Sequence, residues 1–196
     1  MIKIIKRDIT DIDGSDDYTP SCIVNATDPC LSEGAGVSGA IHRAVDGVTP
    51  MEGERWMSRS SLEQDADPII SISTSSAILM IGYHLCEHII QTVAPRVSDP
   101  MWHGRLRECY RNCLELACST STFDEPIRSI AFPMLGTGAY GLPPERADTL
   151  AYDVCSDWED DLDVIWLVVG PHAKDADERV SNLIRYSQSL MIPAGG

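Results

Sequence analysis

The sequence predicts an α/β protein, a three-layer α/β/α sandwich around a central mixed, mostly parallel sheet. Two observations lead to this prediction: short, continuously apolar runs typical of strands buried on both faces, and helical patterns that alternate with them along the chain. With 196 residues, the chain has the length of one domain with its own core. We expect a single domain over residues 1–190 and a disordered tail over residues 191–196.

The predicted strands are apolar, rich in isoleucine and valine, and bounded by turn-forming residues. They cover residues 1–6, 22–26, 77–81, 88–93, 127–132 and 164–169. The predicted helices show apolar residues at three- and four-residue steps, or begin at a proline. They cover residues 39–45, 51–58, 104–118, 144–158 and 177–186. Ser38 stands one residue before the first of these helices, where an N-cap residue is expected.

Composition and charge limit the possible partners. The net charge of −15 repels nucleic acid and anionic lipid, so we expect neither as a partner. The same acidity is also typical of an adaptation to solubility or salt. The seven cysteines contain no CxxC pair and indicate buried thiols rather than a disulfide framework. Because no signal peptide and no long apolar run are evident, we expect a cytoplasmic protein, and a monomer.

Two glycine-rich segments dominate the sequence. Each follows an apolar strand and precedes a helical pattern: residues 34–39 after the strand at 22–26, and residues 134–141 after the strand at 127–132. Such turns present backbone N–H groups to an anion, and glycine allows the backbone to approach a phosphate closely. Two similar turns suggest a site that holds a diphosphate from both sides. Ordinary tight turns are the alternative interpretation.

Around these turns, five blocks of sequence resemble the macro domain family. They appear in the family's order and span most of the chain: Asp8-Ile9, Val24-Asn25-Ala26-Thr27-Asp28, the glycine run ending in Gly39-Ala40-Ile41-His42, the pair Gly82-Tyr83-His84-Leu85 and Ile89-Ile90-Gln91-Thr92-Val93-Ala94-Pro95, and Phe132 to Pro143. The resemblance implies a three-layer fold with a cleft for ADP-ribose. It implies no cofactor and no metal.

The resemblance also implies roles for individual residues. Asp8 would accept from the adenine amino group and Ile9 would offer its backbone, while Tyr140 would border the distal ribose. Asn25 and Asp28 are the candidate catalytic residues beside that ribose. The expected ligand-binding set is Asp8, Ile9, Ala26, Gly34, Ala35, Gly36, Val37, Ser38, Leu135, Gly136, Thr137, Gly138, Ala139 and Tyr140.

Three positions depart from the family pattern. Asp28 replaces the second asparagine of Asn-Ala-Ala-Asn, and Ser38 replaces the aspartate that follows the glycine-run valine in a hydrolytic branch. Gly170 stands near where many members place an aromatic residue against adenine, a role that His172 or Tyr186 could take instead. Asp28 is equally well interpreted as a turn residue before a proline. For Ser38, helix capping is favoured over nucleophilic catalysis.

The functional prediction follows from the resemblance. We expect ADP-ribose binding, free or protein-linked, and hydrolysis of a mono-ADP-ribosyl ester or of O-acyl-ADP-ribose. The alternative is a non-catalytic ADP-ribose reader, and a third option is a phosphatase acting on ADP-ribose phosphates. A metal site at His84, Cys86 and His88 is disfavoured, because their spacing differs from known zinc spacings and no fourth ligand is evident. Cys30 is a candidate redox-sensitive or catalytic cysteine.

Overall fold

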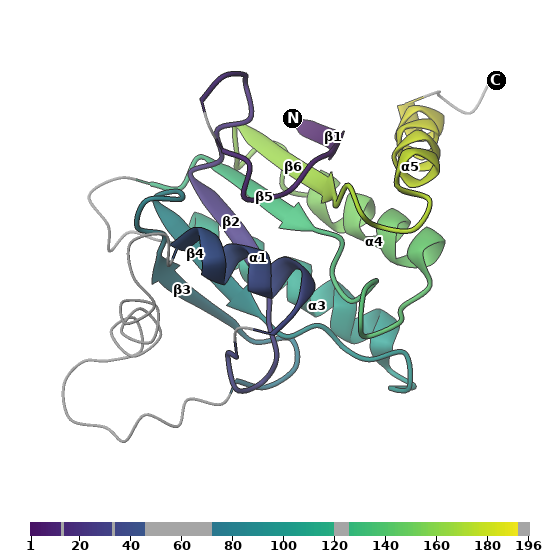
Figure 1. Ribbon diagram of the computed structural model, residues 1–196. Helices are drawn as coiled ribbons and strands as arrows, with labels where there is room; N and C mark the ends of the chain where they lie inside the picture. Colours follow the sequence, from purple (N-terminus) through teal and green to yellow (C-terminus); the bar gives the residue numbers. More distant parts are fainter. Residues whose placement is uncertain (13, 33, 46–71, 120–125, 192–196) are drawn as a thin grey trace.

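The computed structural model describes residues 1–12, 14–32, 34–45, 72–119 and 126–191. Within these ranges the strands form a six-stranded sheet in the order β1-β6-β5-β2-β4-β3 (Figure 1). The strands are β1 Ile2–Lys6, β2 Cys22–Ala26, β3 Ala77–Ile81, β4 His88–Thr92, β5 Ser129–Pro133 and β6 Val164–Val169. Every neighbouring pair is parallel except β3 with β4, which is antiparallel. The predicted mixed, mostly parallel sheet is confirmed.

The helices cover both faces of this sheet. They are α1 Gly36–Val45, α3 Trp102–Cys118, α4 Pro144–Ser156 and α5 Ala176–Met191. In Figure 1, α1 crosses one face, while α3 and α4 lie behind the sheet on the other. Side chains alternate between the faces, so Ile23 and Ile89 pack in one buried cluster with Ile41 of α1. Their neighbours Val24 and Ile90 belong to the cluster that contains the buried residues of α3 and α4. The three-layer prediction is therefore confirmed.

Several element boundaries differ from the sequence prediction. The first helix begins at Gly36 rather than Gly39, so Ser38 lies inside the first turn of α1 and is not its N-cap. The last helix continues to Met191, beyond the predicted end at Tyr186, and its final residues Leu190 and Met191 are exposed. Met191 therefore belongs to α5 rather than to a tail. Residues 192–196 and the predicted helix at 51–58 lie outside the described residues.

The connections between strands create a switch point in the sheet. The chain leaves β2 through α1 and continues toward β3 and β4 on one side, whereas it leaves β5 through α4 and continues to β6 on the other. Since β2 and β5 are adjacent and parallel, their outgoing segments separate at one point of the carboxyl edge. Ligands of open α/β sheets bind at such switch points. Both glycine turns lie in these outgoing segments.

The cysteines pack mostly as apolar core residues. Cys109 and Cys113 of α3 are buried as predicted, whereas Cys30 and Cys118 are exposed, contrary to the expected burial of the thiols. All seven thiols are free. None of the helices in the described ranges has the length and hydropathy that a membrane crossing requires.

Candidate functional site

Both glycine turns leave the sheet at its carboxyl edge, one after β2 and the other after the adjacent strand β5. Tyr140, at the tip of the second turn, packs against a small cluster that contains Leu31, Ile72 and Val93. Leu31 belongs to the segment that joins β2 to the first turn, so both outgoing segments contribute a residue to this cluster or to its border. The Tyr140 carbonyl also accepts a hydrogen bond from the Val97 N–H at 2.9 Å. This contact fixes the second turn against the segment that follows β4.

The first turn depends on glycine for its conformation and for its packing. Gly34 and Gly36 have φ angles of +61° and +65°, in the left-handed region that favours glycine. A Cβ on Gly39 would lie 2.8 Å from the Gly34 carbonyl oxygen, so the loop packs against α1 only because residue 39 has no side chain. The first N–H groups of α1 have no intrahelical acceptor and carry the positive end of the helix dipole. Both the unpaired N–H groups and the helix dipole would stabilise an anion at this position.

The second turn leaves a row of backbone donors unused. Gly136 has a φ of +75°, and a Cβ there would lie 2.5 Å from Leu142 Cδ1. The N–H groups of residues 136, 138, 139 and 140 make no hydrogen bond within the described part of the chain. Unpaired backbone donors grouped in a tight turn form a concave anion site. Leu135 differs from its predicted role: its side chain is buried in the core and its N–H donates to the Tyr110 hydroxyl at 3.1 Å.

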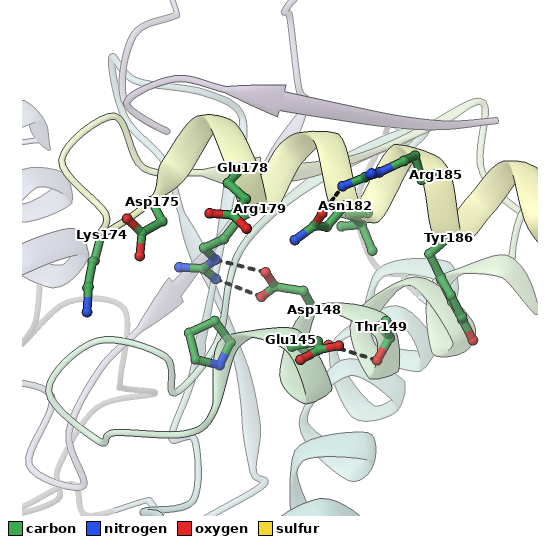
Figure 2. A pocket seen from close by; sticks show the side chains of 12 residues that line it. Glu145, Asp148, Thr149, Lys174, Asp175, Glu178, Arg179, Asn182, Arg185 and Tyr186 are labelled. Atoms are coloured by element: carbon green, nitrogen blue, oxygen red, sulfur yellow. Dashed lines mark hydrogen bonds and ion pairs between the residues drawn. The ribbon is translucent and has the colours of Figure 1, made fainter.

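A buried ion pair between α4 and α5 supports the second turn; Figure 2 shows its two residues, Asp148 and Arg179. Arg179 of α5 donates from Nε and Nη2 to the two carboxylate oxygens of Asp148 of α4, at 2.8 and 2.7 Å. Arg179 Nη2 also donates to Thr137 Oγ1 at 3.3 Å, and Thr137 Oγ1 donates to the Met134 carbonyl at 2.9 Å. The pair lines a groove of about 690 Å³ between α4 and α5. The ion pair contacts the second turn through the hydrogen bond from Arg179 to Thr137.

A chain of hydrogen bonds connects the polar residues predicted beside the ribose. Asn25 of β2 is fully buried and donates from Nδ2 to Gln91 Oε1 at 2.8 Å and to Ser38 Oγ at 3.3 Å. Ser38 Oγ in turn donates to the Ser32 carbonyl at 3.2 Å. The structure therefore brings Asn25, Ser38 and the 28–32 loop together. Because Asn25 is buried, its geometry suits support of the loop rather than contact with a ligand.

Asp28 uses most of its carboxylate within its own loop. Oδ1 accepts from the N–H groups of Cys30 and Ser32 at 2.9 and 3.0 Å, and Oδ2 accepts from the Ser32 hydroxyl at 2.7 Å. An ionised carboxylate has about four acceptor positions, so one remains on Oδ2. Burial acts to raise the pKa of Asp28, but these hydrogen bonds outweigh it and hold the pKa below its ordinary value of 3.8. Asp28 is thus an anion at neutral pH.

At the opposite end of the carboxyl edge of the sheet, Asp8 and Ile9 come after β1 and Gly170 comes after β6. Asp8 Oδ1 accepts from the N–H and the hydroxyl of Thr10 at 3.0 and 2.7 Å, which leaves Oδ2 without a partner in the described ranges. The Ile9 carbonyl is taken by the Tyr18 hydroxyl at 3.0 Å, but the Ile9 N–H has no acceptor among the described residues. One carboxylate oxygen and one N–H are therefore available together. That combination can recognise the edge of a purine base.

Gly170 directly follows β6 at this end, and a Cβ built on it meets no atom within 4 Å. His172, two residues further on, is exposed. Tyr186 is not a candidate for stacking here, because its hydroxyl donates to Asp153 and its ring packs edge-on against Tyr152 on α4. The predicted role of Tyr186 as a substitute is wrong on this geometry.

Metal binding is not supported by the described residues: they contain no group of three or more His, Cys, Asp and Glu side chains placed to hold an ion. Cys86 Sγ instead donates to the His88 carbonyl at 3.0 Å. Sequence reasoning missed Asp148, Arg179 and Ser32. No local pattern marks them, because Asp148 and Arg179 are separated by 31 residues and Ser32 has the composition of any loop residue.

Fold and site together define an α/β protein with glycine turns and unpaired backbone donors at a sheet switch point. The sequence profile of the Macro domain matches residues 24–151. A Macro domain-containing protein of Chlorobaculum tepidum is 36% identical over 77% of this chain and 76% of its own length. O-acetyl-ADP-ribose deacetylase 1 of Pantoea vagans is 33% identical over 78% of this chain and 80% of its own. The Oceanobacillus iheyensis macrodomain with ADP superposes with a TM-score of 0.77 at 27% identity, covering 97% and 93% of the two chains. The chain belongs to the macro domain family.

Proposed function

We propose that this protein binds ADP-ribose at the carboxyl edge of the sheet and hydrolyses mono-ADP-ribosyl esters or O-acyl-ADP-ribose. One observation carries the proposal: two glycine turns with unused backbone donors follow the adjacent strands β2 and β5 at the switch point of the sheet. The relative named O-acetyl-ADP-ribose deacetylase 1 and the similar macrodomain solved with ADP support the same ligand class. The diphosphate would lie between the two turns.

The order of the strands determines which end of the sheet edge would hold the adenine and which would hold the distal ribose. The sheet places the loops in the sequence β1, β6, β5, β2, so Asp8 and Ile9 lie at one end and Asp28 at the other, with the turn at residues 134–141 between them. The free Asp8 oxygen and the Ile9 N–H would bind adenine. The helix α1 N-terminus and the second turn would hold the phosphates. Asp28 and Tyr140 would then flank the distal ribose.

Hydrolysis at this end requires a positioned water. In the proposed step on a mono-ADP-ribosyl ester, the water oxygen attacks the anomeric carbon, the bond from that carbon to the ester oxygen breaks, the carboxylate departs, and a proton of the water passes to solvent. On O-acyl-ADP-ribose, with the acyl group on a ribose hydroxyl, the water oxygen attacks the acyl carbon, the bond from that carbon to the ribose oxygen breaks, the ribose oxygen takes a proton of the water, and the carboxylic acid departs. The remaining acceptor position on Asp28 Oδ2 would orient the ribose hydroxyl or the water. Most of the acceleration would come from positioning and from backbone donors preorganised around the diphosphate.

The first test titrates the protein with ADP-ribose and follows the melting temperature, the amide NMR spectrum and calorimetric heat. We expect shifts confined to the loops at the carboxyl edge. The second test measures release of label from a mono-ADP-ribosylated protein. Asp28→Ala removes the acceptor position that would orient the ribose or the water, so we expect release slowed on the order of 100-fold, and calorimetry with ADP-ribose verifies that the variant still binds. No response to millimolar ADP-ribose would refute the proposal.

A reader without turnover is the second candidate, and the geometry of Asp28 favours it to some degree. Three of the four acceptor positions on this carboxylate already serve its own loop, which is the arrangement of a structural turn residue. Wild-type binding of ADP-ribose together with no release of label from protein or from O-acetyl-ADP-ribose would establish the reader.

The dependence on pH provides an independent check on Asp28. Its pKa is lower in the folded protein than in the unfolded chain, so its contribution to stability is complete above about pH 4 and is lost as the pH falls through the folded pKa. Binding and turnover should therefore show no acidic limb due to Asp28 above about pH 5. The measurement is a pH–rate profile of wild type and Asp28→Asn. An acidic limb near neutrality that disappears in the variant would contradict the ionised state assigned here.

The open position after β6 allows a gain of affinity. Gly170→Phe is expected to strengthen ADP-ribose binding about fivefold, because an aromatic ring beside adenine contributes on the order of 1 kcal/mol and a Cβ at residue 170 meets no other atom. Calorimetry with ADP-ribose measures the change. Gly170→Ala is the matched control, since it adds a Cβ without a ring and should bind as wild type does. Equal affinities for both variants would place adenine elsewhere.

A further inference from the structure

A second pocket lies directly beside Tyr140, outside the sites assigned above. It has a volume of about 250 Å³ and is formed at the same carboxyl edge by the segments after β2, before β3 and after β4. The lining residues are Pro29, Thr74, Val93, Ala94, Pro95, Arg96, Ser98, Asp99 and Tyr140. Pockets for drug-sized ligands measure roughly 300–1,000 Å³, so this one suits a smaller group. Pro29 is adjacent in sequence to Asp28, which places the pocket next to the ribose end of the proposed site.

Arg96 gives this pocket a positive charge. Its guanidinium carbon lies 4.4 Å from the centre of the Tyr140 ring, a cation–π contact. Arg96 is exposed and has no acidic partner in the described ranges of the chain. Asp99, the acidic residue of the pocket lining, is already neutralised: its Oδ2 lies 3.0 Å from Arg105 Nη1, and its Oδ1 accepts from the Met101 N–H at 2.9 Å.

The pocket wall combines apolar surface with one positive charge, which fits a short alkyl group that carries a carboxylate. Val93, Ala94 and Pro95 offer apolar surface for a short alkyl chain, and Arg96 offers a planar donor fork for a carboxylate. We infer that this pocket binds the leaving group of the reaction and that Arg96 selects leaving groups that carry a carboxylate. The inference rests on the proposed ADP-ribose function. The carboxylate could belong to the acyl chain itself or to an acidic side chain beside the modified residue.

The test compares substrates that differ only in this charge. O-succinyl-ADP-ribose is paired with O-acetyl-ADP-ribose, and an ADP-ribosylated peptide with glutamate beside the modified residue is paired with its glutamine counterpart. We expect wild type to favour the anionic member of at least one pair in kcat/KM by roughly three- to tenfold. Arg96→Gln should remove that preference by slowing the anionic member more than the neutral one. Arg96→Lys keeps the charge and should retain most of the preference. The pair that responds identifies the source of the carboxylate.

Two outcomes would overturn the inference. Wild type could show no preference in either pair, or Arg96→Gln could slow both members of a pair equally, which would mean that Arg96 acts only by orienting Tyr140. A parallel titration with unmodified ADP-ribose separates this failure from failure of the proposed function. If ADP-ribose binds but nothing is hydrolysed, the same pairs are compared by calorimetric affinity with the same expected ratios. If ADP-ribose itself does not bind, the proposed function is wrong and the inference with it.

Discussion

Gly138→Val is expected to abolish ADP-ribose binding while leaving the fold intact. Gly138 lies in the second turn, and a Cβ built on it meets no protein atom within 4 Å, so the substituent would project into open space. In the proposed complex the diphosphate occupies that space. Loss of two hydrogen bonds to a charged group, each about 1.5–3 kcal/mol, corresponds to a decrease in affinity of roughly 100-fold or more. Calorimetry measures the affinity, and thermal unfolding verifies the fold.

Gly104→Val is the matched control for this experiment. Gly104 is exposed on α3, and a Cβ there also meets no atom within 4 Å, so the same substitution is made at an equally open position outside the two turns. We expect its affinity to equal that of wild type. If Gly138→Val bound ADP-ribose as tightly as Gly104→Val does, the diphosphate would not lie against the second turn. A contrasting variant is Gly136→Ala, whose Cβ would collide with Leu142 and should destabilise the turn itself.

Asp148→Ala is expected to lower the free energy of unfolding by about 3–5 kcal/mol, the cost of leaving one member of a buried ion pair without its partner. The side chains of Asp148 and Arg179 are only 5% and 10% exposed, so water cannot replace the lost carboxylate. Urea denaturation measures the change. Glu115→Ala removes the acidic partner of an exposed pair on α3, with side chains 57% and 53% exposed, and should cost less than about 0.5 kcal/mol. Equal costs for both variants would contradict the structural role of the buried pair.

The double variant Asp148→Leu with Arg179→Met separates stability from positioning. Apolar side chains of similar size should recover most of the lost stability, since neither charge then remains buried alone. The hydrogen bond from Arg179 to Thr137 stays absent, however, so the second turn loses its anchor. We therefore expect near-normal unfolding together with ADP-ribose binding weakened roughly three- to tenfold. Full recovery of both properties would show that Thr137 does not need the pair.

The strands were the most predictable part of the fold. The predicted ranges 22–26, 77–81 and 164–169 coincide with β2, β3 and β6, because strands in a covered sheet are short, apolar runs with turn residues on both sides. Helix boundaries were less predictable. The glycines at residues 34–39 indicated a turn, and the helix begins among them, since Gly39 allows a contact with the Gly34 carbonyl that no other residue permits. The contact between Gly39 and the Gly34 carbonyl cannot be predicted from a local sequence pattern.

The candidate site was predictable where its chemistry lies in the backbone. A glycine run after a buried strand identifies a potential anion site without any side chain, so both turns were found. The predictions made for side chains depended on their neighbours. Asp28 was correctly placed in the right loop, but only the structure shows that its oxygens bind Ser32 and Cys30.

By itself, the sequence determined the fold class, the order of the strands and helices, and the two glycine turns, because these depend on periodicity and on the conformational freedom of glycine within a few residues. The tertiary structure decided which distant groups meet: Asp148 with Arg179, Arg96 with Tyr140, and Tyr140 with the cluster that contains Leu31. Such pairings depend on how the strands are ordered in the sheet, and that order is set by packing of the whole core rather than by any local segment.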